Sequence, residues 1–323
     1  MLTWVVLLFF SVLARTAAVP VSERAAGTEV RDAVGDRLDV VTRSTSTVTT
    51  LSSAQLSALA PYTQFARAAY CPTSKITNWN CGEACKANSG FEVTLTGGDG
   101  NDVQLFFVGY WPAQNSVVVA HEGTDPTQFL SVLTDGSVLQ KNLDTSLFPG
   151  VPSSVWIHGG FADAQAETAS AILKETKRLI STKGATTVTL VGHSLGGAIA
   201  ELDALFMKVN LPSNIHVKAV TYGTPRVGNA AWPAYFDSQV PDFVRVNNEK
   251  DIIPIVPGRG LGFAHPHGEI HIVAPNDAVS CPGDDDATDS QCTIATVPNI
   301  FVGDILDHLG PYQGINIGTP FCT

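Results

Sequence analysis

The pattern of apolar and polar residues predicts a buried strand, a tight turn and a helix near the middle of the chain. An apolar, β-branched run from Val188 to Val191 is typical of a buried strand. Apolar residues from Ala198 to Met207 form a run too long for one strand and predict a helix. The sequence G-x-S-x-G, centred on Ser194, lies between the two and marks the turn.

Similar patterns predict further strands and helices on both sides of this turn. Ser52, with Gln55 three residues later, predicts the start of a helix that reaches Tyr70 and is bent or broken at Pro61. A second helix is expected over 162–181. The expected strands cover residues 91–95, 103–110, 116–120, 216–222 and 242–247. Alternating strands and helices indicate an α/β fold with a mainly parallel central sheet, and we expect a single domain over 52–323.

The N-terminal segment reads as a targeting signal rather than as part of this domain. The apolar run 4–14 is short for a membrane span, and small residues follow it. We therefore expect residues 1–18 to be a cleaved secretory signal, with a membrane anchor as the alternative. Residues 19–50 contain few large apolar side chains and are expected to form a propeptide or a flexible arm. These features predict a secreted, extracellular protein without a transmembrane anchor.

Composition and charge narrow the classes of function. The chain has 323 residues, of which 44% are hydrophobic, enough for a large core. Its formal net charge of −11 argues against nucleic acid as a partner and against tight binding to anionic lipid headgroups. Contact with a neutral oil surface depends on apolar area instead, so the charge leaves that interaction open.

The cysteine content favours disulfides over a metal site. An even number of cysteines, 6, in a secreted chain predicts three disulfides, although the spacing alone leaves their pairing open. Cys81 and Cys85 have a spacing that metal ligands can adopt. No second close pair and no histidine partner follow them, so we expect no metal.

The turn at Ser194 has the context of a nucleophile elbow, in which a strained turn exposes a serine Oγ above the sheet. The following helix directs its partial positive charge at an oxyanion formed there. A bare G-x-S-x-G also arises by chance, but the flanking strand and helix favour the catalytic interpretation. A serine nucleophile needs a histidine base oriented by a carboxylate, and in this fold the chain order is serine, acid, histidine.

Several residues after Ser194 could complete such a triad. Asp251 is the favoured acid because it follows the end of an expected strand, where sites gather in α/β sheets. Glu249 is close enough to be confused with it. The other candidate acids are Asp237, Asp242, Asp277 and the run Asp284, Asp285 and Asp286. The candidate bases are His265, His267, His271 and His308, whereas chain order excludes His216.

A short helix is expected after the strand 116–120. Pro126 suits its first turn and Asp125 its N-cap. Its apolar residues are Phe129, Leu130, Val132 and Leu133. Periodicity alone does not separate an ordinary core helix from a lid that covers Ser194.

Several motifs in order resemble the fungal class 3 lipases, a family that also contains feruloyl esterases. They lie at 192–197, 224–229, 251–254 and His308, and the resemblance covers roughly 52–323. It implies an α/β-hydrolase fold with Ser194 as nucleophile, Asp251 as orienting acid and His308 as base. It further implies oxyanion donors from Thr124 and the Leu195 N–H, and a structural role for His265. The disulfides that it implies are Cys71–Cys322, Cys81–Cys85 and Cys281–Cys292.

The resemblance predicts a secreted serine ester hydrolase that needs no cofactor. The apolar candidate lid favours a triacylglycerol lipase acting at oil–water interfaces, with a feruloyl, aryl or sterol esterase as the alternative. A non-catalytic lipid-binding protein on the same scaffold is a remote alternative. One departure concerns the residue before Gly123, where the family often has arginine and this chain has Glu122.

Overall fold

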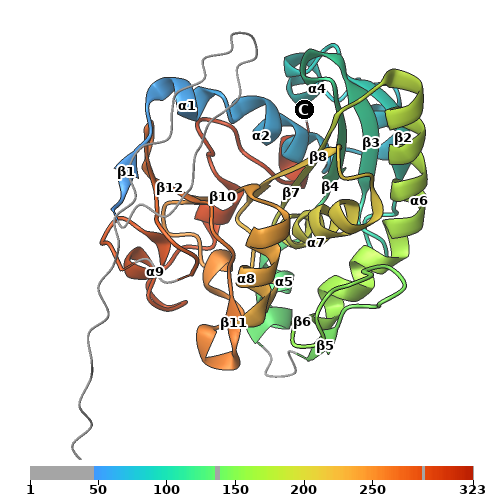
Figure 1. Ribbon diagram of the computed structural model, residues 1–323. Helices are drawn as coiled ribbons and strands as arrows, with labels where there is room; N and C mark the ends of the chain where they lie inside the picture. The colour runs from blue at the N-terminus through green and yellow to red at the C-terminus, as the bar shows by residue number, and fades with distance from the viewer. Residues whose placement is uncertain (1–46, 135–138, 286–287, 323) are drawn as a thin grey trace, which may run out of the picture. The chain divides into compact units, whose positions relative to one another are not determined.

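A nine-stranded sheet forms the centre of the computed structural model, which describes residues 47–134, 139–285 and 288–322 (Figure 1). The strand order is β1-β13-β12-β10-β8-β7-β4-β3-β2. The five neighbouring strands β4, β7, β8, β10 and β12 are parallel, and the strands outside them are antiparallel. The strands of this sheet are β1 Thr49–Thr50, β2 Glu92–Gly97, β3 Phe106–Trp111, β4 Ser116–His121, β7 Thr187–His193, β8 His216–Tyr222, β10 Asp242–Asn248, β12 Glu269–Ala274 and β13 Asp277–Ser280.

Helices and a small second sheet complete the described part of the chain. The second sheet has the order β11-β9-β6-β5, with β5 Gln140–Asn142, β6 Trp156–His158, β9 Gly228–Asn229 and β11 Phe263–Ala264. The α-helices are α1 Ser53–Ser57, α2 Ala60–Ala68, α3 Thr73–Thr77, α4 Glu83–Ala87, α5 Pro126–Thr134, α6 Gly159–Lys183, α7 Leu195–Asn210, α8 Ala231–Gln239 and α9 Thr293–Thr296. The 3₁₀ turns are η1 Pro112–Gln114, η2 Ile253–Ile255, η3 Arg259–Leu261, η4 Leu306–Leu309 and η5 Thr319–Phe321.

The two faces of the central sheet carry separate apolar cores because side chains alternate along each strand. Val117 and Val119 of β4 pack with α6, α7 and α8, whereas Val118 and Ala120 pack with α1, α2 and α4. Figure 1 shows α6 and α7 along one layer and α1 and α2 along another. The mainly parallel sheet is the one that the sequence pattern predicts, and the architecture is the α/β-hydrolase fold that the family resemblance implies, with parallel strands buried on both faces.

The structure refines two of the predicted helices. Ser52 and Gln55 form the expected reciprocal capping box at α1. The expected break lies just before Pro61, which occupies the first turn of α2 because a proline there loses no helical hydrogen bond. The long helix α6 begins at Gly159, three residues before the predicted start, and ends at Gly184 with φ of 67°.

Most of the N-terminal predictions fall outside the described residues. The expected signal, 1–18, and most of the expected arm, 19–50, belong to the segment 1–46 that is not described. Thr49 and Thr50, the last residues of that arm, pair with Val279 and Ser280 of β13. The sheet therefore begins slightly before residue 52.

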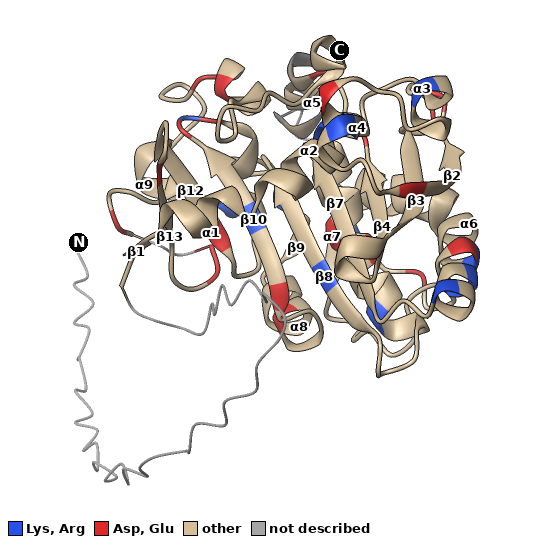
Figure 2. Cartoon of the chain, turned by 90° about the horizontal axis from the view of Figure 1, so that it is seen from above, with Lys and Arg blue, Asp and Glu red and all other residues tan. Residues whose placement is uncertain are grey.

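Three disulfides link the pairs that the family resemblance implies. Cys71–Cys322 joins the end of α2 to the C-terminal segment, and Cys81–Cys85 and Cys281–Cys292 close short loops. Within the described ranges, no helix is both long and apolar enough to cross a bilayer. Figure 2 shows acidic and basic residues spread over several elements, with both signs present on α6.

Candidate active site

Ser194 occupies a strained turn between β7 and α7. Its φ of 60° and ψ of −130° lie outside the regions that residues other than glycine usually adopt. The two flanking glycines allow this turn to form. A Cβ on Gly192 would lie 2.0 Å from the Gly196 carbonyl oxygen, and one on Gly196 would lie 2.4 Å from the His121 oxygen. The backbones of strand and helix thus approach as closely as a nucleophile elbow requires.

His308 and Asp251 form a buried pair next to this elbow. His308 Nδ1 lies 2.8 Å from Asp251 Oδ2, and the two side chains are 0% and 1% exposed. Asp251 follows β10, and its Oδ1 accepts a hydrogen bond from the Ile253 N–H at 2.9 Å. An ionised carboxylate only accepts hydrogen bonds, so the proton on His308 sits on Nδ1 and Nε2 is left as the basic atom.

Two side-chain atoms next to the elbow lack hydrogen-bond partners within the described residues. Ser194 Oγ and His308 Nε2 are both buried, and neither has a hydrogen-bond partner among the described residues. The His308 ring lies beside the elbow, with its centroid 4.4 Å from that of His193. Catalytic hydrogen bonds are often loose before substrate binds, so the missing bond is compatible with a serine–histidine pair.

Gly223 provides the space for the acid and the base. Its φ is +51°, and an added Cβ would lie 2.8 Å from both Asp251 Oδ2 and His308 Nδ1. Any side chain at this position would therefore displace the histidine–aspartate pair. The glycine that follows β8 is required by both backbone conformation and close approach.

The segment after β4 lies against the other side of the elbow. A Cβ on Gly123 would come within 2.8 Å of Ser194 Cβ, and the next residue, Thr124, is half-buried. Leu195 is the first residue of α7, so its N–H has no partner within the helix. Thr124 and Leu195 thus stand on the two segments that meet at Ser194, as an oxyanion hole requires.

Glu122 ties this segment to the neighbouring loop. Its Oε2 accepts from the Leu105 N–H at 3.1 Å, and its own N–H donates to the Leu105 oxygen at 2.8 Å. Burial raises the pKa of Glu122 to about 7, although the bond from Leu105 opposes this shift. Preceding it, His121 lies 2.8 Å from Asp203 Oδ2 on α7. Glu122 and His121 thus hydrogen-bond this segment to Leu105 and to Asp203 of α7.

The candidate lid is a real helix that packs on the core. Asp125 Oδ1 accepts from the Gln128 N–H at 3.1 Å, which is the expected N-cap. Phe129 and Leu133 are buried, and the Phe129 ring lies 6.1 Å from that of Phe161. Leu130 is half-buried, while the side chain of Val132 lies outside the described residues. Ser194 itself is 0% exposed, so the site is closed in this structure.

The other candidate bases have partners of their own. His265 Nε2 lies 2.8 Å from the Pro254 oxygen, which fits the structural role that the resemblance implies. His271 lies between the backbone oxygens of Gln291 and Glu249. His267 pairs with Asp237 at 2.6 Å, outside the reaction centre.

The remaining acids are also engaged elsewhere or lie at the surface. Asp242 pairs with His216 at 2.7 Å, and Asp285 pairs with Arg226. Asp277 is exposed on β13, and Asp286 lies outside the described residues. Of the candidate acids, Asp251 is the one that the structure pairs with a buried histidine after Ser194.

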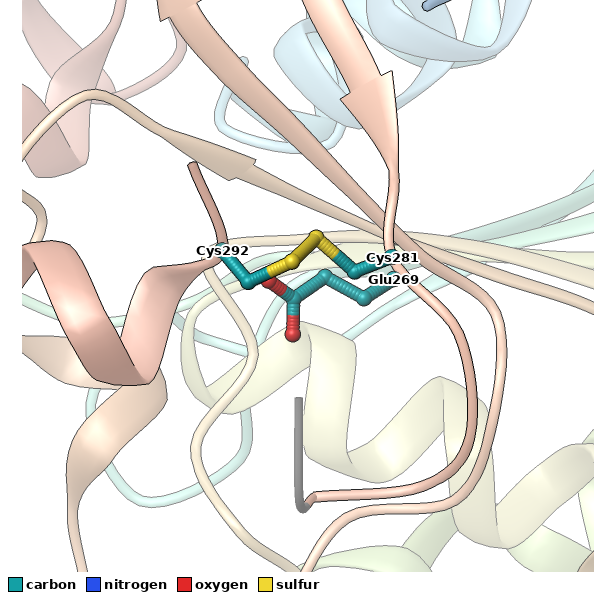
Figure 3. A group of neighbouring side chains, drawn as sticks. All are labelled: Glu269, Cys281 and Cys292. Carbon is teal, nitrogen blue, oxygen red and sulfur yellow. A yellow bond between two sulfur atoms is a disulfide. The ribbon is translucent and has the colours of Figure 1, made fainter. Parts of the chain in front are cut away.

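One cluster has the composition of a metal site but not its chemistry. Atoms of Glu269, Cys281 and Cys292 lie within 4.8 Å of one another (Figure 3). Both sulfurs belong to a disulfide, so neither is a thiolate that could bind a metal. Glu269 Oε2 instead pairs with Arg245 Nη1 at 2.9 Å. We therefore treat the cluster as structural.

Sequence reasoning missed one side chain at the site. Tyr70, just after α2, places its hydroxyl oxygen 2.6 Å from His193 Nδ1 across a sequence separation of 123 residues. No local pattern marks this tyrosine. The only available signal was its position beside Cys71, which the resemblance links to the C-terminal segment that follows His308.

Comparisons with known proteins agree with this geometry. The profile of the family Lipase (class 3) matches residues 118–261. The chain is 32% identical over 161 residues to a secreted mono- and diacylglycerol lipase of Malassezia restricta, covering 50% of this chain and 51% of that protein. It is 29% identical over 287 residues to a lipase of Rhizomucor miehei, covering 84% and 72%. The match thus spans about half the length of the Malassezia relative.

The fold comparison extends further along the chain. The crystal structure of a lipase from Rhizopus microsporus var. chinensis superposes with a TM-score of 0.72 at 27% identity, covering 90% of this chain and 96% of that one. An α/β-hydrolase fold with an elbow serine beside a buried histidine–aspartate pair defines the structural class of serine hydrolases. Within that class, the chain is similar to the class 3 lipases over residues 118–261 and to named fungal lipases.

Proposed function

We propose that this protein is a secreted lipase that hydrolyses acylglycerol esters through an acyl-enzyme on Ser194. The observation that carries the proposal is the closed reaction centre. Ser194 Oγ on a strained turn and His308 Nε2 are both buried, and neither has a hydrogen-bond partner within the described part of the chain. Asp251 lies 2.8 Å from the other nitrogen of His308 and orients the ring. Other buried atoms, such as His265 Nδ1, also lack a partner there. What sets Ser194 and His308 apart is that the serine is on a strained elbow and the histidine is paired with a carboxylate.

The proposed reaction has two steps. His308 Nε2 takes the proton of Ser194 Oγ as the oxygen attacks the ester carbonyl carbon. The tetrahedral oxyanion is stabilised by Thr124 and the Leu195 N–H, each donor contributing about 3–4 kcal/mol to lowering the barrier. The alcohol leaves with the proton from His308. Water then attacks the acyl-enzyme with His308 again as base, which releases the fatty acid and restores Ser194.

An oil–water interface is the proposed site of action. Ser194 is fully buried, so substrate requires a rearrangement that exposes it, and α5 is the proposed lid. The segment that leads to His308 also carries exposed apolar side chains, with Phe301 90% and Leu306 69% exposed. A net charge of −11 favours a neutral surface over an anionic one. Secretion is proposed from the N-terminal sequence and from the similarity to proteins named as secreted lipases.

The proposal also names which acylglycerols the protein hydrolyses. The apolar α5 favours triacylglycerols, whereas the Malassezia relative is named a mono- and diacylglycerol lipase. These two substrates are therefore the first and second candidates. In both substrates, the atom that Ser194 Oγ attacks is the carbonyl carbon of an ester.

A substrate panel tests this function. The purified protein would be assayed on emulsified triolein, diolein and monoolein, on a soluble p-nitrophenyl ester and on methyl ferulate, with Ser194→Ala as the control. We expect fatty acid release whose rate rises sharply once the acylglycerol exceeds its solubility. Faster turnover of methyl ferulate with no rise at the interface would favour the feruloyl esterase alternative. Lipid binding without hydrolysis of any ester would contradict the proposal.

A further inference from the structure

The hydroxyl of Tyr70 joins three parts of the reaction centre. The side chain is buried, and its oxygen lies 2.6 Å from His193 Nδ1. On the far side of that ring, His193 Nε2 lies 2.7 Å from the backbone oxygen of His308. Gly123 lies against the Tyr70 oxygen, because a Cβ added to Gly123 would stand 2.4 Å from it.

The direction of each hydrogen bond follows from the partners. A backbone carbonyl only accepts, so His193 Nε2 must carry a proton and donate it to the His308 oxygen. Burial, reinforced by His308, holds the pKa of His193 well below its usual range, so the ring is neutral and Nδ1 is an acceptor. The Tyr70 hydroxyl therefore donates to Nδ1.

These two bonds and the close contact with Gly123 reach a neighbour of each group in the proposed mechanism. Gly123 precedes Thr124, the proposed oxyanion donor, and His193 precedes Ser194. The last bond reaches the backbone of His308, the proposed base. One hydroxyl from the N-terminal helical region thus fixes the oxyanion segment, the elbow and the base relative to one another.

We propose that Tyr70 is a positioning residue for acyl transfer, acting through Gly123 and His193 rather than on the substrate. This inference rests on the proposed ester hydrolysis. Misplacement of catalytic groups by about 1 Å can cost about 100-fold in rate, and an oxyanion donor is worth a similar factor. These interactions act in the transition state, so their loss lowers kcat and leaves KM nearly unchanged.

Tyr70→Phe removes the hydroxyl and keeps the ring. On a soluble p-nitrophenyl ester we expect kcat to fall about 10- to 100-fold with KM within about twofold of the original. Tyr222→Phe is the matched control, because its equally buried hydroxyl bonds to Leu59 and Thr63, away from the reacting atoms. It should lose similar stability in urea and retain kcat within about twofold.

The outcomes separate the inference from the proposed function. An unaltered protein that hydrolyses no ester contradicts the function itself. An active protein whose Tyr70→Phe variant keeps its kcat, or loses no more kcat than Tyr222→Phe, overturns the role of Tyr70. A second measurement needs no variant of Tyr70. The ¹⁵N shifts of His193 in the unaltered protein should show the proton on Nε2, and a proton on Nδ1 instead would overturn the proposed direction of the bonds.

Discussion

The reaction centre and the helix that is proposed to cover it are held in different ways. Around Ser194, hydrogen bonds and close glycine contacts fix each group, as in the 2.8 Å bond between His308 and Asp251. Helix α5, Pro126–Thr134, is anchored instead by buried apolar side chains, notably Phe129 and Leu133. Directional bonds specify one geometry, whereas apolar contacts can be exchanged for an oil surface at little cost.

This difference assigns separate roles to the reaction centre and to α5. In the proposed mechanism, the chemistry depends on groups that keep their positions. Access of the substrate to Ser194 depends on α5, whose apolar contacts resemble those that a lipid would offer. Substitutions in the reaction centre should therefore lower turnover on every ester. Substitutions on α5 should distinguish emulsified from dissolved substrate.

The largest effect is expected from Asp251→Asn. An amide in place of the carboxylate favours the wrong tautomer of His308, so kcat on a soluble ester should fall by about 10⁴-fold with the fold intact. Steady-state kinetics and circular dichroism would measure the two quantities. Turnover within tenfold of the original protein would assign the acid to another residue.

Gly223→Ala should have the next largest effect. A Cβ there collides with both Asp251 and His308, so we expect kcat to fall about tenfold or more, together with a stability loss of about 1–2 kcal/mol from the positive φ. Gly184→Ala is the control, because Gly184 has φ of +67° with no atom within 4 Å of an added Cβ. It should lose comparable stability in urea while keeping its kcat. Equal kinetic effects of the two variants would argue against the special role of Gly223.

A smaller and selective effect is expected from Leu130→Asn on α5. Losing part of an apolar side chain should cost about 1 kcal/mol of interfacial transfer, or about fivefold in hydrolysis of emulsified triolein. The rate on a soluble ester should stay within about twofold. Leu173→Asn, at a half-buried leucine of α6, is the control and should affect neither rate selectively. Equal losses on both substrates would show that α5 is an ordinary core helix.

The smallest effect concerns the pH dependence of stability at Glu122. Its folded pKa of about 7 exceeds the ordinary value of 4.5, so the folded protein binds more protons between these values. This group therefore contributes stability that is lost as pH rises from about 4.5 to about 7. Glutamine does not titrate, so the stability of Glu122→Gln relative to the original protein should rise as pH rises through this window. Urea unfolding at several pH values, with exposed Glu167→Gln as control, measures the difference, and a constant offset would contradict it.

The sequence predicted the parts of the molecule that depend on local patterns. The elbow strand and helix follow from apolar runs on either side of Ser194, and the expected strand 216–222 coincides with β8. The choice of Asp251 and His308 came from the order of motifs rather than from any local signal at His308. Their 2.8 Å contact depends on a loop closure over 57 residues that periodicity does not encode.

The unpredicted features arise from contacts between distant segments. Tyr70 meets His193 only because α2 packs on the face of the sheet that carries Val191 and Val220. The position of the Glu122 side chain likewise depends on its hydrogen bond from Leu105, which lies in the connection between β2 and β3. Such contacts appear only once the layers are assembled, so the sequence predicts the residue types of the site better than their supports.

Covalent labelling tests the central claim most directly. A fluorophosphonate reacts with a serine only when a base and an oxyanion hole activate it. Peptide mapping by mass spectrometry should place a single adduct on Ser194, and Asp251→Asn should slow its formation strongly. No adduct at Ser194 in folded protein, or an adduct on a different serine, would contradict the account.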